Sequence, residues 1–467
     1  MTGGLPTRAT RAKVPATESR GPQASGGSRG PHPWASTDVL IVGAGPAGLA
    51  AAVELRRLCA GTVLVVDRDD AAGGIPRHSE HTGFGLRDLR RVLTGPGYAR
   101  RYSAAAAAAG ADIRLGATVT GWDGDGTPDG GLPLAGGPHR VTLTSPAGIQ
   151  TVAARAVLLA TGCRERPRTA RLVPGDRPPG VLTTGELQRR VYLAGERLPG
   201  RALVVGAEHV SFSAMVTLAH AGAQAIALVT DRPRHTSYAA FGLAASWRWR
   251  VPVWPSTVVR RVAGRGRLEG AELADLRTGE TRFVPCDLVV FTGDWIPDHE
   301  LARAGGLVMD PGTRGPAVDT ALETSVPGVF AAGNLVHAAE TADVAALGGR
   351  HAARGIAAFL RAGDGARGGR GDGPAPGPVR LPVTAEPPLL WIAPNVLRAG
   401  GPAPPRGRFV LRSDVFARLA RLEVWQDGRR LATGVSYGMK PDRPVRLGAS
   451  WTDRADPGGG PVTVRLA

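Results

Sequence analysis

Three glycines and one aspartate near the start of the chain have the spacing of a dinucleotide-binding site. The glycines follow the pattern Gly43-x-Gly45-x-x-Gly48, in which they would permit a tight turn, a close backbone approach to a pyrophosphate, and close helix–strand packing. Asp67 lies about 20 residues further on and can accept a hydrogen bond from a ribose hydroxyl. The anion would lie where unpaired helix N–H groups and the helix dipole favour negative charge.

The elements that must position these residues are visible in the surrounding pattern. Apolar runs at Val39–Gly43 and Val63–Asp67 predict two strands, and Ala47–Leu58 is helical in pattern. A glycine motif alone is weak evidence because glycine-rich turns are common. Here the strand, turn, helix and strand occur in the required order, which supports the interpretation.

The same plan occurs a second time along the chain. Ala202–Asp231 repeats the order of runs, and each unit later reaches an apolar strand that closes in Thr-Gly, at Ala156–Gly162 and at Asp287–Gly293. A third run, Thr324–Asn334, precedes a helical pattern from about Thr341 to Leu360. The repeat predicts two nucleotide-binding-type domains.

This order of motifs resembles the two-dinucleotide-binding-domain flavoproteins, the glutathione reductase-like superfamily of FAD/NAD(P)-dependent oxidoreductases. The resemblance covers roughly Thr37 to Gly363. Within it, Gly73–Gly85 and Leu93–Arg101 resemble the FAD-containing subunits of opine and imino acid oxidases and of hydrogen cyanide synthase. The implied fold class is α/β, with two Rossmann-like dinucleotide-binding domains in which an NAD(P)-type domain interrupts the FAD domain.

The resemblance implies FAD as the cofactor and assigns residues to it. They are Gly43, Gly45, Pro46, Ala47, Gly48, Asp67, Arg68, Gly74, Thr161, Gly162, Gly333, Asn334 and Thr341. Where the superfamily usually has Gly-Asp, whose carboxylate binds the ribityl chain, this chain has Gly333-Asn334, and we expect the amide to keep that bond. The following helix would point its positive end at the flavin and favour the charge of the reduced form. The alternative is an ordinary amphipathic helix that closes the sheet.

The second glycine turn departs from the pattern of the NAD(P)H-using members. It reads Gly206-Ala-Glu208-His-Val-Ser211, so a carboxylate occupies the middle glycine position and would repel a pyrophosphate. NAD(P) binding is therefore doubtful. Arg232 and Arg234 could imitate a site for a 2′-phosphate, although arginine is so abundant here that ordinary surface residues are favoured.

The cysteines exclude the disulfide-reductase branch of the superfamily. Cys59, Cys163 and Cys286 are isolated, and no CxxC or CxxxxC pair occurs. Unpaired thiols suit a reducing cytoplasm. Cys163 follows the first Thr-Gly closure directly and is interpreted as a packing residue.

Catalytic candidates lie in the segment that faces the flavin in the resembled family. His78 or His81 would take a proton from the substrate, and Arg77 would bind a substrate carboxylate. The alternative is that these side chains only bind loop backbone or the flavin. No metal site is expected, since no third ligand follows at a recognisable spacing.

The composition limits the possible partners. The formal net charge is +17, carried almost entirely by arginine. Basic residues are spread along the chain, aromatic content is low and no nucleic-acid motif occurs, so we expect no nucleic acid partner. No run reaches the length of a membrane-spanning helix and no secretory signal is recognisable, so we expect a soluble, cytoplasmic protein.

The two ends of the chain differ from its middle. The first 36 residues are rich in Gly, Pro, Ser and Arg and are expected to be disordered. Near the C-terminus, alternating segments and the turn signal Asp427-Gly428 predict a small antiparallel β domain that docks a partner or caps the flavin domain. The predicted divisions are a tail (1–36), the FAD domain in two parts (37–166 and 301–363), a degenerate NAD(P)-type domain (167–300), a linker (364–380) and the β domain (381–467).

Three functional hypotheses follow. The first is an FAD-dependent oxidoreductase subunit that takes hydride from an amino, imino, opine or hydroxy acid and passes electrons to a ferredoxin-like 2Fe-2S subunit or to a second flavoprotein subunit. The second is an NAD(P)H-dependent flavin reductase, or diaphorase. The third is a non-catalytic flavin-bearing assembly subunit.

Overall fold

A computed structural model describes residues 35–123, 137–237, 250–368 and 378–467. The predicted N-terminal tail lies outside these ranges except for its last two residues. Most of the predicted linker (364–380) also lies outside these ranges. Strand β1 begins at Ala35, and helix α7 continues to Gly368, so ordered structure extends into both predicted segments.

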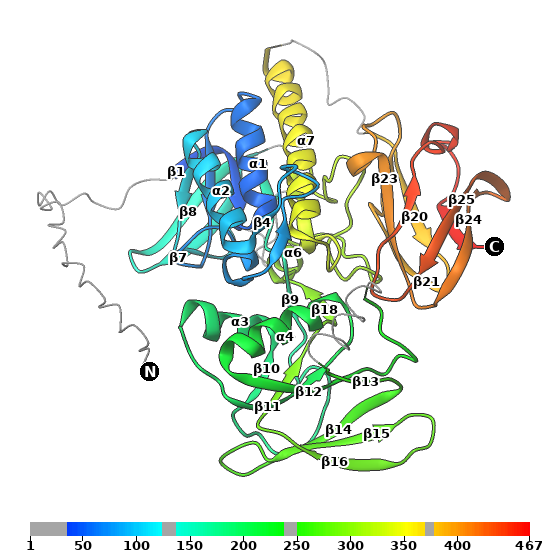
Figure 1. Ribbon diagram of the computed structural model, residues 1–467. Helices are drawn as coiled ribbons and strands as arrows, with labels where there is room; N and C mark the ends of the chain where they lie inside the picture. Colours follow the sequence, from blue (N-terminus) through cyan, green and yellow to red (C-terminus); the bar gives the residue numbers. More distant parts are fainter. Residues whose placement is uncertain (1–34, 124–136, 238–249, 369–377) are drawn as a thin grey trace, which may run out of the picture. The chain divides into compact units, whose positions relative to one another are not determined.

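The first sheet contains the first predicted nucleotide-binding unit (Figure 1). Its strands run in the order β5-β2-β1-β8-β7-β6, and β19 pairs with β8. The strands are β1 (Ala35–Val42), β2 (Val63–Val66), β5 (Asp112–Arg114), β6 (Thr118–Trp122), β7 (His139–Ser145), β8 (Gly148–Leu159) and β19 (Val329–Ala331). The pairs β1/β2, β1/β8, β2/β5 and β8/β19 are parallel, so their carboxyl ends meet at one edge.

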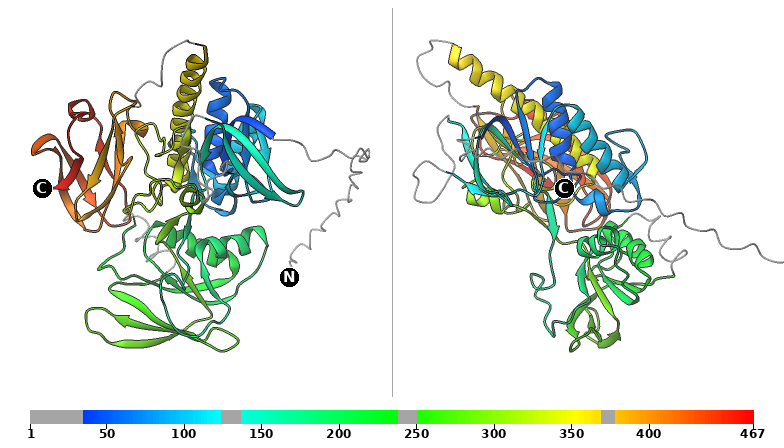
Figure 2. Two further views of the ribbon diagram at one scale, coloured as in Figure 1. Left: turned by 180° about the vertical axis from the view of Figure 1, so that it is seen from behind. Right: turned by 90° about the vertical axis from the view of Figure 1, so that its left-hand side faces the viewer.

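Helices α1 (Pro46–Arg57) and α7 (Ala342–Gly368) lie side by side (Figure 1 and Figure 2). Small residues allow this close packing, because a Cβ atom on Gly349 would lie 2.0 Å from the Ala47 carbonyl oxygen. Helix α2 (Gly95–Ala108) follows the short strands β3 (Thr82–Phe84) and β4 (Leu93–Thr94).

The second sheet is fully parallel, in the order β10-β17-β11-β12-β13. Its strands are β10 (Val181–Thr183), β11 (Gly200–Val205), β12 (Ala223–Val229), β13 (Val253–Trp254) and β17 (Leu288–Phe291), with helices α3 (Thr184–Gln188) and α4 (His209–Ala221). An antiparallel meander of β14 (Thr257–Ala263), β15 (Gly270–Asp275) and β16 (Thr281–Pro285) follows. The two-stranded ribbon β9/β18 (Cys163–Glu165 and Trp295–Pro297) precedes the short helix α6 (Glu300–Ala304).

The C-terminal segment forms two sheets with their own core (Figure 2). The first has the order β22-β20-β27-β24-β25 and the second β21-β23-β26. The strands are β20 (Arg380–Ala385), β21 (Leu389–Ala393), β22 (Val396–Arg398), β23 (Arg408–Ser413), β24 (Ala417–Gln426), β25 (Arg429–Met439), β26 (Val445–Gly448) and β27 (Val462–Leu466). The hairpin predicted at Asp427-Gly428 joins β24 to β25, and both turn residues have the positive φ angles of a tight hairpin.

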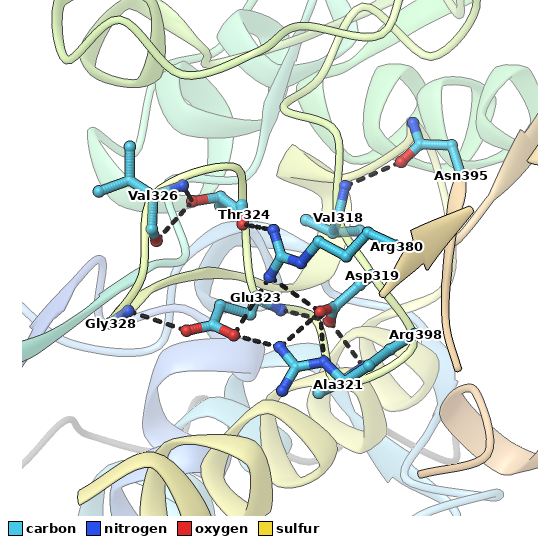
Figure 3. A network of polar contacts seen from close by, with 10 residues as sticks. All are labelled: Val318, Asp319, Ala321, Glu323, Thr324, Val326, Gly328, Arg380, Asn395 and Arg398. Carbon is cyan, nitrogen blue, oxygen red and sulfur yellow. Dashed lines mark hydrogen bonds and ion pairs between the residues drawn. The ribbon is translucent and has the colours of Figure 1, made fainter. Parts of the chain in front are cut away.

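An ion-pair network connects this C-terminal segment to the turn before β19 (Figure 3). The Asp319 carboxylate, whose side chain is fully buried, accepts hydrogen bonds from Arg380 (2.9 Å) and from Arg398 Nε (2.6 Å). Glu323 pairs with the same two arginines. Buried carboxylates need such partners, so these arginines hold the two segments together.

Candidate functional site

The first glycine turn has the geometry that a pyrophosphate site requires. A Cβ atom on Gly43 (φ +110°) would lie 2.4 Å from the Ala160 carbonyl oxygen, and one on Gly48 would lie 1.9 Å from that of Gly43. A Cβ atom on Gly45 would meet nothing within 4 Å, and this residue caps the N-terminus of α1. The turn is thus closely packed on the protein side and open at the position where an anion would approach α1.

Two distant segments converge on this helix N-terminus. A Cβ atom on Gly333 (φ +71°) would lie 2.8 Å from the Ala47 Cβ atom, and one on Gly74 would lie 3.0 Å from the Gly45 Cα atom. Stretches near positions 43, 74 and 333 therefore surround one end of α1. This is the cradle that an extended dinucleotide needs, so the residues present fit FAD.

Asp67 holds the first turn and keeps acceptor capacity for a ribose. Its carboxylate accepts hydrogen bonds from the backbone N–H groups of Ala44 (2.6 Å) and Asp69 (2.9 Å). A carboxylate offers about four acceptor positions, so further bonds are available. Arg68 is largely exposed and lies 3.6 Å from the Asp298 carboxylate.

Asn334 uses its amide to close the loop that leads to α7. Its Nδ2 group donates to the Glu340 carbonyl oxygen (3.2 Å), and its Oδ1 atom accepts from the Glu340 N–H group (2.8 Å). An aspartate could not make the first of these bonds, which gives a structural reason for asparagine here. One N–H and one lone pair remain for a ribityl chain. Thr341 next to this loop binds Asp343 and accepts from Arg87 (3.2 Å).

The first Thr-Gly closure connects the two nucleotide-binding units. The Thr161 hydroxyl donates to the Asp298 carbonyl oxygen (2.7 Å), and Gly162 has a φ of +80°. Burial and the nearby carboxylates of Asp298 and Glu165 raise the pKa of the Cys163 thiol far above its usual value. A protonated thiol is not a nucleophile, in agreement with a packing role for Cys163.

Arg77 is held by acidic neighbours in this structure. Its guanidinium pairs with Asp69 (3.1 Å) and Asp70 (3.0 Å) and also donates to the Ala71 carbonyl oxygen. A role in binding a substrate carboxylate therefore requires an exchange of these pairs. The sequence pattern did not indicate these pairs, because spacing alone does not show which side chains meet within an irregular loop.

The two candidate histidines differ in their surroundings. His78 is buried, and desolvation together with the charges of Arg189 and Arg77 lowers its pKa to about 4, against a hydrogen bond with Gln188 that acts the other way. His81 is half-buried, and its Nδ1 atom lies 2.9 Å from the Thr82 carbonyl oxygen, which leaves Nε2 for other partners. A base with a pKa of about 4 takes up a proton poorly at neutral pH, so His81 suits that role better than His78.

The second glycine turn is filled by its own carboxylate. A Cβ atom on Gly206 would lie 2.6 Å from one Glu208 carboxylate oxygen, and a Cβ atom on Gly293 would lie 2.9 Å from the other. The Ser211 hydroxyl lies 2.8 Å from that of Thr292 beneath this carboxylate. Burial raises the pKa of Glu208. The side chain therefore lies over the glycines that a pyrophosphate would approach, as the sequence predicted.

Acidic and basic residues that the sequence did not single out border this second turn. Glu165 accepts a hydrogen bond from the Gly185 N–H group (2.8 Å), and burial raises its pKa to about 7, with a smaller contribution from the charge of Glu208. His209 opens α4, and its pKa is lowered by burial and by the charges of His81 and Arg443. His81 of the first unit thus faces the start of α4 in the second.

The C-terminal segment contacts the residues that follow β12. Arg232 pairs with Asp414 (2.6 Å), the Arg234 guanidinium lies 4.4 Å from the centre of the Phe416 ring, and Lys440 donates to the Ser237 carbonyl oxygen (2.9 Å). Both arginines considered for a 2′-phosphate are therefore engaged by the C-terminal segment.

Comparison with known proteins identifies the family. Residues 37–349 match the family model described as pyridine nucleotide-disulphide oxidoreductase. The chain belongs to this family. It is an FAD-dependent oxidoreductase that lacks the redox cysteine pair, and the match ends before the C-terminal segment.

Similar curated proteins include subunits of two oxidases. The chain is 28% identical over 349 residues to an opine oxidase subunit of Agrobacterium tumefaciens (strain Ach5), covering 69% of this chain and 66% of that protein. It is 29% identical over 380 residues to the alpha subunit of sarcosine oxidase of Corynebacterium sp. (strain P-1), covering 78% of this chain and 36% of that protein. The predicted resemblance to oxidase subunits is confirmed. The chain spans less than two thirds of the length of either relative.

Solved structures support the fold. Thioredoxin reductase of T. acidophilum superposes with a TM-score of 0.57 at 22% identity, covering 69% of this chain and 98% of that one. Thioredoxin reductase of Lactococcus lactis gives 0.56 at 18% identity, covering 70% and 99%. Within the described residues, no helix is long and apolar enough to cross a membrane. In the same part of the chain, no cluster of three or more His, Cys, Asp or Glu side chains is arranged to hold a metal ion.

Proposed function

We propose that this flavoprotein takes hydride from a small amino, imino, opine or hydroxy acid and passes the electrons to a partner protein rather than exchanging them with NAD(P)H. The observation that carries this proposal is the position of the Glu208 carboxylate over Gly206 and Gly293. A pyrophosphate at this turn would meet like charge and an occupied volume. The first turn offers no such obstacle.

The proposed FAD site uses the cradle at the N-terminus of α1. FAD supplies a two-electron acceptor for hydride when it is bound. Gly43, Gly45 and Gly48 would admit the pyrophosphate, Asp67 the ribose, and Asn334 the ribityl chain. The remaining residues of this site would be Pro46, Ala47, Arg68, Gly74, Thr161, Gly162, Gly333 and Thr341. In this proposal residues 37–166 and 301–363 form the FAD domain, 167–300 the degenerate second domain, and 381–467 a separate β domain.

The residues of the 75–81 segment would handle the proton. His78 is buried and uncharged at neutral pH, so it would accept a hydrogen bond from a substrate N–H or O–H group. His81 is partly open to solvent and would receive the proton and release it. Arg77 would bind a substrate carboxylate only after leaving Asp69 or Asp70.

The partner in this proposal is a second polypeptide. The curated relatives are themselves named as subunits, of opine oxidase and of sarcosine oxidase. The partners we propose are a ferredoxin-like 2Fe-2S subunit together with a second flavoprotein subunit. Co-purification of the chain with the products of neighbouring genes would test this part of the proposal.

Anaerobic flavin spectroscopy tests the reaction. The purified yellow protein is mixed with NADH, NADPH, and a panel of amino, imino, opine and hydroxy acids, and the flavin absorbance is followed. We expect at least one acid to bleach the flavin about 100-fold faster than either nicotinamide, a difference of about 2.7 kcal/mol in activation free energy. Rapid bleaching by NADH or NADPH would establish a diaphorase instead. A flavin that no donor reduces, even with the partners present, would indicate an assembly subunit.

A further inference from the structure

A cavity of about 70 Å³ lies between the loop that begins α7 and the C-terminal segment. One wall comes from η4 (Gly333–Leu335) and the first turns of α7, and the other from η5 (Pro405–Gly407), β23 and β26. A single water needs roughly 10 to 15 Å³ on this measure, so the cavity holds a group of roughly five to seven water-sized atoms. The cavity combines residues that lie far apart in the chain.

Three exposed arginines line this cavity, and Glu340 is the one carboxylate among the described residues of its wall. Arg406, Arg408 and Arg446 contribute to its wall, and none of them makes a hydrogen bond or an ion pair through its side chain with any other residue that the structure describes. By contrast, the neighbouring Arg87 pairs with Asp343 at 3.3 Å. Burial and the charges of Arg446, Arg408 and Arg87 lower the pKa of Arg406, whereas the charge of Glu340 acts the other way. An anion would relieve the repulsion among these arginines.

The remaining polar groups in the wall do not balance this charge. Glu340 is the carboxylate of the cavity, and burial raises its pKa despite the charges of Arg412, Arg446 and Arg87. His337 is uncharged, because burial and the charge of Arg412 lower its pKa to about 3, and its buried Nδ1 atom has no partner among the described residues. Even an ionised Glu340 leaves two guanidinium charges unmatched.

We propose that this cavity binds a small dianion, either phosphate or a short dicarboxylate. The guanidinium groups of Arg406, Arg408 and Arg446 would bind its oxygens, and the His337 imidazole would add a donor in the tautomer that protonates Nδ1. Arg406 has a left-handed backbone conformation (φ +61°), which is unfavourable for a residue with a side chain. Gly333 and Asn334 of the proposed FAD site form part of one wall of this cavity, whereas the three arginines lie on the other wall, in the C-terminal segment. The proposal goes beyond the redox function, and the flavin-loaded protein is the form in which it is tested.

Calorimetric titration of the flavin-loaded protein tests this site. The probes are inorganic phosphate, malonate and acetate, so that the two sources of a dianion are compared with each other and with a monoanion. The variant is R406Q/R446Q, and the matched control is R418Q, which removes an exposed arginine of the same β region outside the cavity. A second variant, R408Q, tests the remaining cavity arginine alone, and thermal unfolding checks that every variant is folded.

We expect phosphate or malonate to bind saturably at millimolar concentration or below, and acetate at least about tenfold more weakly. If phosphate binds more tightly than malonate, the ligand is a phosphate, and if malonate binds more tightly, it is a dicarboxylate. R406Q/R446Q should weaken binding at least about tenfold, R408Q should weaken it less, and R418Q should leave it unchanged. Absence of saturable binding, equal binding by R406Q/R446Q, or an equal loss in R418Q would overturn the proposal. Flavin reduction plays no part in this readout, so failure of the proposed redox function would not affect it.

Discussion

The two glycine turns of this protein follow the same order of strand, turn and helix but carry different residues at the middle position of the turn. Gly43, Gly45 and Gly48 correspond in order to Gly206, Glu208 and Ser211. At the first turn the middle position faces open space, whereas at the second the Glu208 carboxylate covers Gly206 and Gly293. The fold provides a helix N-terminus in both places, and we propose that the side chain at this one position decides whether an anion can approach it.

Moving the carboxylate into the first turn should have the largest effect. The substitution G45E places a negative charge beside the proposed pyrophosphate, and like-charge contact of this kind costs several kcal/mol. We expect FAD affinity to fall at least about 1000-fold, or about 4 kcal/mol, measured as flavin content and as the Kd for added FAD. The neutral variant G45Q has a similar size, and a loss as large as that of G45E would show that volume rather than charge excludes the cofactor.

The second unit also contacts the C-terminal segment through Arg232, Arg234 and Ser237, and the network of Figure 3 connects that segment to the turn before β19. The substitution R398Q leaves Asp319 and Glu323 with one arginine fewer. We expect the free energy of unfolding to fall by about 3 kcal/mol and limited proteolysis to cleave the C-terminal segment faster. R277Q removes an arginine from an exposed pair with Asp275 and should change neither measurement. Equal stability of R398Q and the parent protein would contradict the anchoring role.

The second turn differs from the first in having two buried acids close together. The pKa of Glu165 is raised to about 7, so the folded protein binds this proton more tightly than the unfolded chain does. The resulting stabilisation of the folded state is complete below about pH 4.5 and is lost as the pH rises through 7. The shift in pKa sets an upper limit of about 3 kcal/mol, and we expect a loss of about 2 kcal/mol. Thermal unfolding between pH 5 and 8 should show this loss in the parent protein and not in E165Q. The same pH profile in both proteins would show that Glu165 ionises normally.

Opening the second turn should have the smallest effect. The substitution E208G restores the glycine pattern and removes the carboxylate, but Arg232 and Arg234 remain bound to Asp414 and Phe416. We expect NADH to bind about tenfold more tightly to E208G than to the parent protein, measured by fluorescence titration. E208Q keeps the volume without the charge and separates the two contributions. An unchanged Kd in both variants would show that the contacts of Arg232 and Arg234 with the C-terminal segment, rather than Glu208, exclude the nucleotide.

The sequence predicted the features that depend on local pattern. The structure contains the strands around Gly43, the repeat at Gly206 and the hairpin at Asp427-Gly428. These features were predictable because strand periodicity and turn preference depend on consecutive residues. The obstruction by Glu208 was also predictable, since it follows from one substitution in a known pattern.

Features that depend on particular side-chain contacts were not predicted. Asp319 binds Arg398 of a distant segment, whereas Arg77 binds Asp69 and Asn334 binds Glu340 within a single loop, and none of these pairs has a signal in spacing or composition. Helix α7 also continues beyond Leu360, through the glycines that suggested a linker. At Gly349, close packing against α1 outweighs the weak helix propensity of glycine.

The buried position of Asp319 limits how this protein can be shortened. A chain that ends before Arg380 would retain the domain that matches the family, but it would leave Asp319 and Glu323 without either of their arginines. Removing the two C-terminal sheets alone should therefore give an unstable product. The same deletion combined with D319N and E323Q would remove the two unpaired carboxylate charges and should give a more stable product. Any ancestor or engineered relative without the C-terminal sheets would be expected to carry uncharged residues at these two positions.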